Sequence, residues 1–421
     1  MRRGKHPGAP SPGNNPMHIS YDGKTAALIS THISPSGEGY PAKYIRLERE
    51  MEMSKYKICV YAICKNEEAF VDRWMDAVGE ADLVVVTDTG STDNTVEKLR
   101  ARGAVVYEER IVPWRFDTAR NLAMDHVPED ADICVSNDMD EVFRPGWREK
   151  LEKAWQPWHT RARYLFTWSR GEGGKQFTME KIHRRHGFRW VHPVHEILEY
   201  TGQDPESAVW LEGVVLDHFP DTAKPRSQYL PLLELSREEN PDDDRVAFWL
   251  GREYLYHGKY NECVNTLTAY LKMPTALWNE ERCAAMRFIS SAFRDRGDTE
   301  TARLWLFKAI AECPMIREPY LQMARLGYQR NDWPLVYYMV DSALRIMTKT
   351  GSYLFEPDTY GFALYDLGAI ACYRLGLYQK SYEYALEACR LAPNDERLKK
   401  NLELIAEKTG KQEGGAGNGE A

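Results

Sequence analysis

The sequence lacks several patterns that would assign it to a protein class directly. Its eight cysteines include no C-x-x-C pair, so a disulfide framework and a zinc ribbon are disfavoured and reduced thiols are expected. No apolar run approaches the ~18 residues of a membrane span, and residues 1–16 have no apolar centre of a signal peptide. Positive charge is not in excess, because 63 acidic residues outnumber 55 basic ones. We therefore expect a cytoplasmic protein without general attraction to polyanions.

The composition is that of a folded chain with more than one domain. Hydrophobic residues make up 43% and charged residues 28% of the 421 residues, and a chain of this length typically forms roughly two or three domains. We expect an N-terminal extension at 1–55 that is partly disordered with a strand-like run at 26–33, an α/β domain at 56–225, a helical domain at 226–409 and a flexible Gly-rich tail at 410–421.

The α/β domain is predicted from short apolar runs that alternate with helical stretches. The runs at 58–64, 82–88, 104–109 and 131–138 have the length and β-branched content of buried parallel strands. Helices are expected between them at 67–78, 92–102 and 118–125, the second capped by Thr92 and Asp93. Strands rich in aromatic and basic residues follow at 164–170, 176–183 and 209–219, so the parallel sheet is expected to become mixed.

The helical domain contains an internal repeat. Alignment of the turns between paired helices places Gly258, Gly297, Asn331 and Gly376 in register, at intervals of 39, 34 and 45 residues. The tetratricopeptide repeat has a period of 34 residues, and the sequence resembles that family. We attribute the two long intervals to extra loops at 273–280 and 347–358 and count four repeat-like units, the middle two degenerate.

Polar residues follow the predicted strands, where an open parallel sheet binds ligands. They lie at 65–68, 88–93 and 138–141. Asp138 and Asp140 are the strongest signal, because two carboxylates one residue apart can turn towards one divalent cation and its phosphates. A solvated loop or a helix cap is the alternative for an isolated D-x-D, but the position behind an apolar strand favours function.

Asp88 and Arg120 have two explanations each. Asp88 is either a turn former or a carboxylate that accepts hydrogen bonds from a base or ribose. Arg120 is either a surface residue of a helix or, if it points inward, a cation that neutralises a diphosphate. Both functional explanations require that the strand order bring these loops together.

Four segments, at 62–68, 88–95, 116–121 and 138–141, resemble successive motifs of the family 2 glycosyltransferases with the GT-A fold, in the same order and with similar spacing. The resemblance spans about 57–225, and the attached repeats resemble a bacterial subgroup with this domain order. It implies a Rossmann-like mixed α/β GT-A domain followed by an all-α tetratricopeptide-repeat solenoid.

The resemblance also implies a nucleotide-sugar donor, often a UDP-sugar, and a divalent metal, Mn²⁺ or Mg²⁺. Donor-binding candidates are Asn66, Glu67, Asp88, Arg120 and Asp138. Metal-binding candidates are Asp138, Asp140 and His218. The segment at 194–196 resembles a His-Glu pair of the repeat-bearing subgroup, so Glu196 is the candidate base and His195 the candidate for orienting it or binding metal. An ordinary polar strand or loop residue is the alternative for each histidine.

Other features are open to two interpretations. His183, His186, His192 and His195 form two H-x-x-H pairs, but residues three apart on a strand face opposite sides, which disfavours zinc. The run at 161–190 contains eight Lys/Arg and two Asp/Glu residues, which suits either solvated strand faces or a basic rim for the donor or an acidic acceptor. Trp168 or Trp190 could stack on a sugar, whereas packing in a core or in the repeats is the alternative expected for most of the twelve tryptophans.

The leading hypothesis is therefore an enzyme: a metal-dependent, inverting glycosyltransferase that acts on a glycan, a protein or a nucleic acid, with repeats that bind the acceptor or a protein partner. The alternative is a non-catalytic scaffold whose tetratricopeptide repeats bind a protein. Nucleotidyl transfer is disfavoured, because a Gly-rich, basic loop would be expected after the first strand and Lys65-Asn66-Glu67 is not one.

Overall fold

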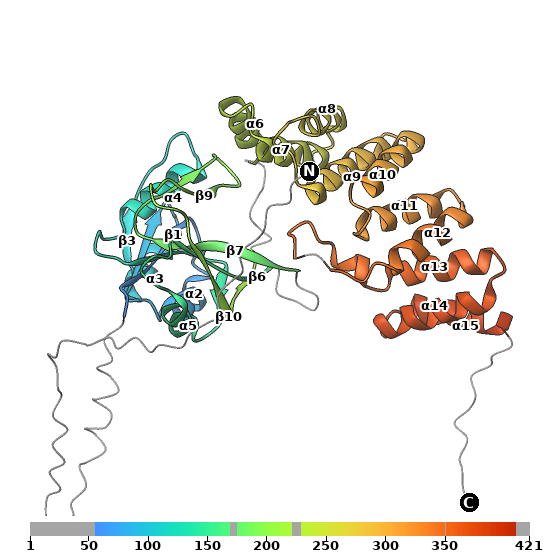
Figure 1. The fold of residues 1–421 in the computed structure, drawn as a ribbon. Helices are drawn as coiled ribbons and strands as arrows, with labels where there is room; N and C mark the ends of the chain where they lie inside the picture. The colour runs from blue at the N-terminus through green and yellow to red at the C-terminus, as the bar shows by residue number, and fades with distance from the viewer. Residues whose placement is uncertain (1–54, 169–174, 221–228, 350, 410–421) are drawn as a thin grey trace, which may run out of the picture. The chain divides into compact units, whose positions relative to one another are not determined.

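The computed structural model describes residues 55–168, 175–220, 229–349 and 351–409. These ranges form a mixed α/β sheet domain and a series of helices (Figure 1). The N-terminal extension with its strand-like run at 26–33, and the tail at 410–421, lie outside the described residues. The predicted fold class is confirmed, and all eight cysteines are free thiols.

An eight-stranded mixed sheet forms the centre of the first domain, in the order β3-β2-β1-β4-β7-β6-β10-β5. Its strands are β1 (Ile58–Cys64), β2 (Leu83–Asp88), β3 (Val105–Glu108), β4 (Ile133–Ser136), β5 (Glu141–Phe143), β6 (Arg161–Trp168), β7 (Lys175–Arg184) and β10 (Ala208–His218). A two-stranded sheet pairs β8 (Phe188–Val191) with β9 (Ile197–Tyr200).

The strand directions bring the carboxyl ends of six strands to one edge of the sheet. β1 is parallel to both β2 and β4, as the alternating pattern predicts. β7 is antiparallel to β4 and β6, and β6 is parallel to β10. The carboxyl ends of β1, β2, β3, β4, β6 and β10 therefore open at the same edge, because β3 is parallel to β2. Ligands of such sheets bind at this edge.

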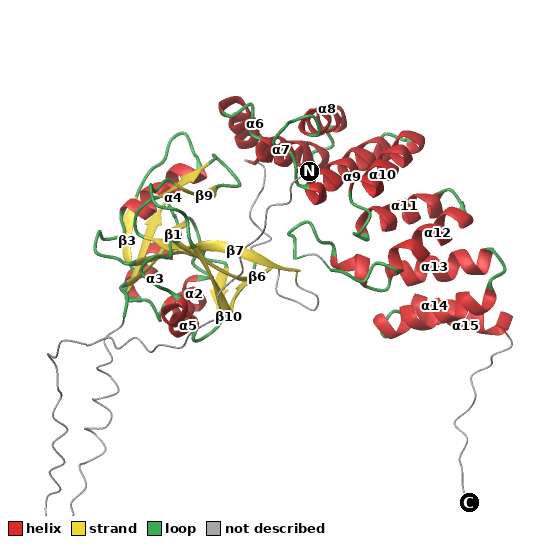
Figure 2. Ribbon diagram, in the orientation of Figure 1, coloured by secondary structure: helices red, strands yellow, loops and turns green. Residues whose placement is uncertain are grey.

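Side chains of β1 alternate between two hydrophobic cores, as the two-residue period of a strand requires. Ile58, Val60 and Ala62 pack on one side with residues of α2 (Val71–Val78), α3 (Thr95–Ala101) and α5 (Trp147–Ala154). Cys59 and Tyr61 pack on the other side with residues of α4 (Phe116–Asp125), β8 and β9. Figure 2 shows the strands and these helices.

Several local predictions differ from the structure. The helix expected from Thr92 begins at Thr95, with Asn94 at the N-cap position. Thr92 and Asp93 instead hold the loop, because the Thr92 amide donates to Asn66 Oδ1 (2.7 Å) and Asp93 Oδ1 accepts from the Thr95 amide (3.1 Å). Four elements were not predicted from the sequence: α5, β5, β8 and β9.

The second domain is a succession of helices: α6 (Tyr229–Glu239), α7 (Asp244–Tyr256), α8 (Tyr260–Tyr270), α9 (Asn279–Asp295), α10 (Thr299–Glu312), α11 (Glu318–Gln329), α12 (Trp333–Leu344), the 3₁₀ turn η1 (Pro357–Tyr360), α13 (Ala363–Arg374), α14 (Tyr378–Leu391) and α15 (Glu396–Thr409). Within the described residues, four consecutive pairs from α7 to α14 match the predicted repeats. None of the described helices is both long and apolar enough to cross a bilayer.

The turns of the four helix pairs share a backbone conformation. Gly258, Gly297, Asn331 and Gly376 have φ values of 68°, 88°, 57° and 75°. Glycine and asparagine are the residues that adopt this left-handed conformation most readily at helix ends. The longer connections expected at 273–280 and 347–358 lie between α8 and α9 and between α12 and α13.

Candidate active site

The loop after β2 is closed by Asp88. The Asp88 carboxylate is buried, and its Oδ2 accepts hydrogen bonds from the amides of Gly90 (3.0 Å) and Ser91 (2.9 Å). Gly90 has a φ of 105°, which allows this tight turn. Asp88 therefore shapes the loop in the way that the turn-forming explanation requires, at the edge of the sheet where a donor would bind.

The loop after β1 is tied to the same segment. Asn66 has a φ of 54°, and its amide donates to Ser91 Oγ at 2.8 Å. The neighbouring amide of Glu67 donates to Thr95 Oγ1 at 2.8 Å. Asn66 and Glu67 thus join the first two strand ends through their backbone, which makes the β1 and β2 loops a single unit.

Arg120 and Asp138 meet at the end of β4. Arg120 points inward from α4 and is 6% exposed, and its guanidinium donates to both Asp138 oxygens at 2.7 and 3.0 Å. Lys181, from β7, contacts Asp138 Oδ2 and Glu141 Oε1, both at 2.9 Å. The inward orientation that a functional Arg120 requires is present, but both Asp138 oxygens already bind cations.

The charges of this cluster stabilise one another. Burial by itself raises the pKa of the Asp138 carboxyl, but Arg120 and Lys181 outweigh burial and hold that pKa well below its usual range. Burial lowers the pKa of Lys181, and Asp138 and Glu141 more than reverse this effect. Burial raises the pKa of Glu141. The cluster is thus a compact ionic network at the sheet edge.

Glu196 joins the same network from the loop between β8 and β9. Arg120 Nε contacts Glu196 Oε1 at 2.5 Å, so one arginine links Glu196 and Asp138. His195 does not point to this network: its ring stacks on Trp249 of α7, with centroids 4.4 Å apart. The structure therefore brings Glu196, but not the His195 ring, to Asp138.

Asp140 and His218 form a separate pair beside the network. His218 ends β10, and its Nε2 lies 3.2 Å from Asp140 Oδ2. The His218 residue is 6% exposed, and its ring lies against Trp168 at the end of β6, with centroids 4.4 Å apart. Trp168 itself is 41% exposed. This pair combines a carboxylate and an imidazole beside an open aromatic face.

The Asp140–His218 pair fits a divalent cation that a substrate helps to bind. No group of three or more metal-ligating side chains occurs among the residues that the structure describes, so side chains alone do not supply a complete coordination shell there. A carboxylate and an imidazole can supply two ligands, and substrate phosphates commonly complete the shell of Mg²⁺ or Mn²⁺. Asp138 would bind the same metal only if one of its oxygens released Arg120 or Lys181.

The other histidines of the H-x-x-H pairs are engaged elsewhere. His183 is completely buried, and its ring nitrogens lie 2.9 Å from the Tyr61 hydroxyl and 2.7 Å from the Arg184 carbonyl oxygen. His192 Nε2 lies 3.5 Å from Asp243 Oδ2. Trp190 is 2% exposed and donates from Nε1 to the Tyr61 hydroxyl, so of the two tryptophans expected to stack on a sugar, Trp190 is a core residue.

Most described cations of the basic run at 161–190 face acidic side chains. The pairs are Arg161 with Glu180 and Glu206, Arg163 with Glu180, Lys181 with Asp138 and Glu141, Arg184 with Asp204, and Arg185 with Glu129. Glu180 of the run itself and acidic residues from other parts of the chain thus offset the local positive charge. This pairing favours solvated strand faces over a basic rim.

Sequence reasoning missed the part played by Lys181 and the link from Arg120 to Glu196. Lys181 was counted only as one charge in the basic run. Its position on a strand beside β4 is set by antiparallel pairing between residues more than forty apart, as in Cys134 with His183. No local motif signals that contact.

The sheet edge thus gathers several carboxylates beside an Asp–His pair. In the comparison with protein families, residues 59–200 match the model of glycosyl transferase family 2. The resemblance inferred from the four motifs is thereby confirmed for this segment, which contains the predicted strand-end residues from Asn66 to Glu196.

Solved structures similar to this chain include repeat proteins. MamA (MSR-1 C2) is 15% identical, with 40% of this chain and 87% of that chain covered and a TM-score of 0.31. TTC0263, a thermophilic TPR protein in Thermus thermophilus, is 19% identical, with 42% and 88% covered and a TM-score of 0.30. A tetratricopeptide repeat protein from Parabacteroides merdae is 18% identical, with 43% and 66% covered and a TM-score of 0.33.

Proposed function

We propose that this protein is a metal-dependent, inverting glycosyltransferase that moves a sugar from a nucleoside diphosphate to an acceptor nucleophile. The observation that carries the proposal is the convergence of Asp88, Asp138, Asp140 and His218 at one sheet edge within a chain whose segment 59–200 matches glycosyl transferase family 2. β1 alone separates β2 from β4, so the loops of Asp88 and Asp138 start about 10 Å apart, within the span of a nucleoside diphosphate.

The donor lies across this edge in the proposed arrangement. The nucleoside contacts the joined loops of Asn66, Glu67 and Asp88, and the diphosphate extends towards Asp140 and His218. A divalent ion held by that pair would offset the negative charge of the departing nucleoside diphosphate. Trp168 offers its exposed face to a sugar ring, because aromatic faces bury the apolar face of a sugar. A UDP-sugar with Mn²⁺ is the first combination to test.

Glu196 is the proposed base for the acceptor. Arg120 fixes Glu196 through Oε1, and we assign proton acceptance from the acceptor hydroxyl to Oε2. The same arginine contacts Asp138, so Asp138 acts on Glu196 through Arg120. A single displacement with one base inverts the anomeric carbon.

The base assignment predicts that Glu196→Gln lowers transfer by about 100-fold or more while donor binding changes little, because only proton transfer is removed. Initial rates and donor titration by calorimetry measure the two effects. Glu199→Gln, on the exposed side of β9, is the control. Equal transfer by the two variants would remove Glu196 from the mechanism.

The enzyme proposal is tested with purified protein, a panel of nucleotide sugars and Mn²⁺, Mg²⁺ or EDTA. Thermal shift finds the donor, and release of nucleoside diphosphate measures turnover. Mass measurement of candidate glycan, protein and nucleic-acid acceptors then identifies the product. Metal-dependent turnover supports an enzyme, whereas no turnover with any donor would favour a scaffold whose repeats bind a protein.

A further inference from the structure

The loop that carries Glu196 has a backbone that needs external support. His192 and His195 have φ values of 77° and 52°, in the left-handed region that residues with a Cβ rarely adopt. Such conformations persist where surrounding contacts hold them, and they concentrate at functional sites. The contacts of the segment 192–196, called here the Glu196 loop, identify what holds it.

The hydrophobic support comes from the first two helices after the sheet domain. Val194 is 3% exposed and belongs to a buried cluster with Leu230, Leu232 and Leu233 of α6 and Leu250 of α7. On the other side of the loop, the Pro193 carbonyl oxygen accepts from the amide of Phe116, the first residue of α4. The Glu196 loop is therefore enclosed by both domains.

Two residues of α7 contact His195 directly. Arg245 Nη1 donates to the His195 carbonyl oxygen at 2.9 Å. Trp249, one helical turn later, stacks on the His195 ring at 4.4 Å with an interplanar angle of 24°. Arg245 holds the backbone and Trp249 the side chain of the residue that precedes Glu196.

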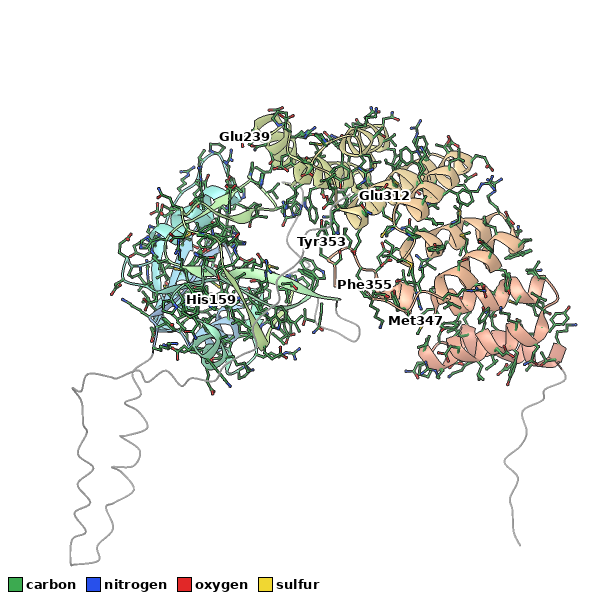
Figure 3. The ribbon with its side chains drawn as sticks, in the orientation of Figure 1. His159, Glu239, Glu312, Met347, Tyr353 and Phe355 are labelled. Carbon is green, nitrogen blue, oxygen red and sulfur yellow. The ribbon has the colours of Figure 1, made fainter. Side chains whose placement is uncertain are left out.

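Trp249 is in turn held by residues of the helical domain. Its ring stacks with Tyr353, at 5.5 Å and 15°, and the Arg252 guanidinium lies 3.9 Å from its centroid. Tyr353, labelled in Figure 3, lies in the connection between α12 and α13 and donates to Glu281 Oε2 of α9 at 2.7 Å. The position of Trp249 thus depends on several repeats.

We propose that Arg245 and Trp249 are positioning residues for Glu196, so that the first repeat is part of the catalytic architecture as well as a surface for partners. The proposal rests on the proposed role of Glu196 as the base. When either contact is lost, the strained His195 backbone relaxes, and the Glu196 carboxylate moves relative to Arg120 and the acceptor. Small displacements of a catalytic group reduce turnover without weakening the binding of a substrate that it does not touch.

The test compares Trp249→Leu and Arg245→Met with Trp333→Leu in the full-length protein. Trp333 is a partly buried tryptophan of α12 that packs within the helical domain. Because both residues are tryptophans, the two substitutions by leucine remove side chains of the same size. We expect kcat to fall on the order of tenfold or more in the first two variants, with the donor KM nearly unchanged and kcat retained in Trp333→Leu. Trp249→Phe keeps an aromatic ring on His195 and should restore most of the rate.

A second readout needs no turnover. Hydrogen exchange of the backbone amides at 194–196, measured by mass spectrometry, should be faster in Trp249→Leu and Arg245→Met than in Trp333→Leu. Unchanged exchange at 194–196 in folded Trp249→Leu and Arg245→Met, or an unchanged kcat of these two variants in an active enzyme, overturns the inference. If the wild type turns over no donor, the proposed function fails, and exchange alone decides whether α7 holds the Glu196 loop.

Discussion

Lys181 has a role in the structure that the sequence did not indicate. In the sequence it is one of eight cations in the run at 161–190. In the structure its side chain lies between Asp138 and Glu141, with both contacts at 2.9 Å and 15% of the side chain exposed. Its main role is to compensate two acidic groups that Arg120 alone does not neutralise.

Lys181→Met should therefore lower the free energy of unfolding by about 3 kcal/mol, because two carboxylates keep their places and lose a cation. Urea unfolding followed by circular dichroism measures this change. Lys57→Met is the control, since Lys57 pairs with Asp130 at an exposed site and should change stability little. Equal stability of the two variants would contradict a compensating role for Lys181.

His183 gives the fold a pH dependence of known sign. Burial lowers the pKa of His183 from 6.5 to about 3. Between these values the unfolded chain binds a proton at His183 that the folded chain does not. The contribution of neutral His183 to the free energy of unfolding is therefore fully present above pH 6.5 and is lost as the pH falls towards 3.

From pH 6.5 to 5 the wild type should lose about 2 kcal/mol of unfolding free energy more than His183→Gln, at ~1.4 kcal/mol per pH unit. Urea titrations at pH 5, 6 and 7 measure the difference. His186→Gln, at an exposed position, should keep the wild-type slope. Parallel pH profiles for the wild type and His183→Gln would show that His183 is not held neutral.

At the scale of elements, prediction from sequence succeeded where the signal was local. β1, β2 and β4 follow from apolar runs, and the four repeat turns follow from glycine or asparagine at regular intervals. β5 has three residues and α5 eight, which is too short for periodicity to stand out. The ionic network could not be predicted either, because Arg120, Lys181 and Glu196 meet only through pairing across the sheet and a loop from another sheet.

Helices α7 and α8 approach each other closely where Gly251 faces Leu267. A Cβ built on Gly251 would lie 2.4 Å from Leu267 Cδ2, closer than any van der Waals contact allows. Gly251→Ala should destabilise the protein by about 1–3 kcal/mol through overpacking. The same substitution should cost less in a Leu267→Ala background than in the wild type, because the truncated Leu267 leaves room for the added Cβ.

Thermal and urea unfolding of the single and double variants measure this coupling. Gly351→Ala serves as control, because a Cβ at Gly351 meets no atom within 4 Å. Additive effects of the two substitutions would mean that the helices do not meet at this pair.

At the scale of the whole molecule, the proposed site uses loops from β1, β2, β4, β10 and the β8–β9 connection, and α7 supports one of them. In the proposal, the carboxyl ends of β1, β2, β4, β6 and β10 supply positions for a nucleotide and a metal at one edge, and the β8–β9 connection supplies the base. Asp138 and Asp140 are two residues apart in the sequence but have separate contacts, Asp138 with Arg120 and Lys181 and Asp140 with His218. This division assigns metal binding to Asp140 rather than to Asp138 in our proposal.

The most direct test of this account compares the Mn²⁺ dependence of donor turnover in the wild type, Asp140→Ala and Asp125→Ala. Asp140 is partly exposed and contacts His218, so its loss should leave the fold nearly unchanged, and Asp125 is an exposed aspartate at the end of α4. We predict that turnover in Asp140→Ala falls by about 100-fold or more at every Mn²⁺ concentration, with unfolding midpoints preserved and Asp125→Ala fully active. Near-normal, metal-dependent turnover by Asp140→Ala would contradict the proposed site.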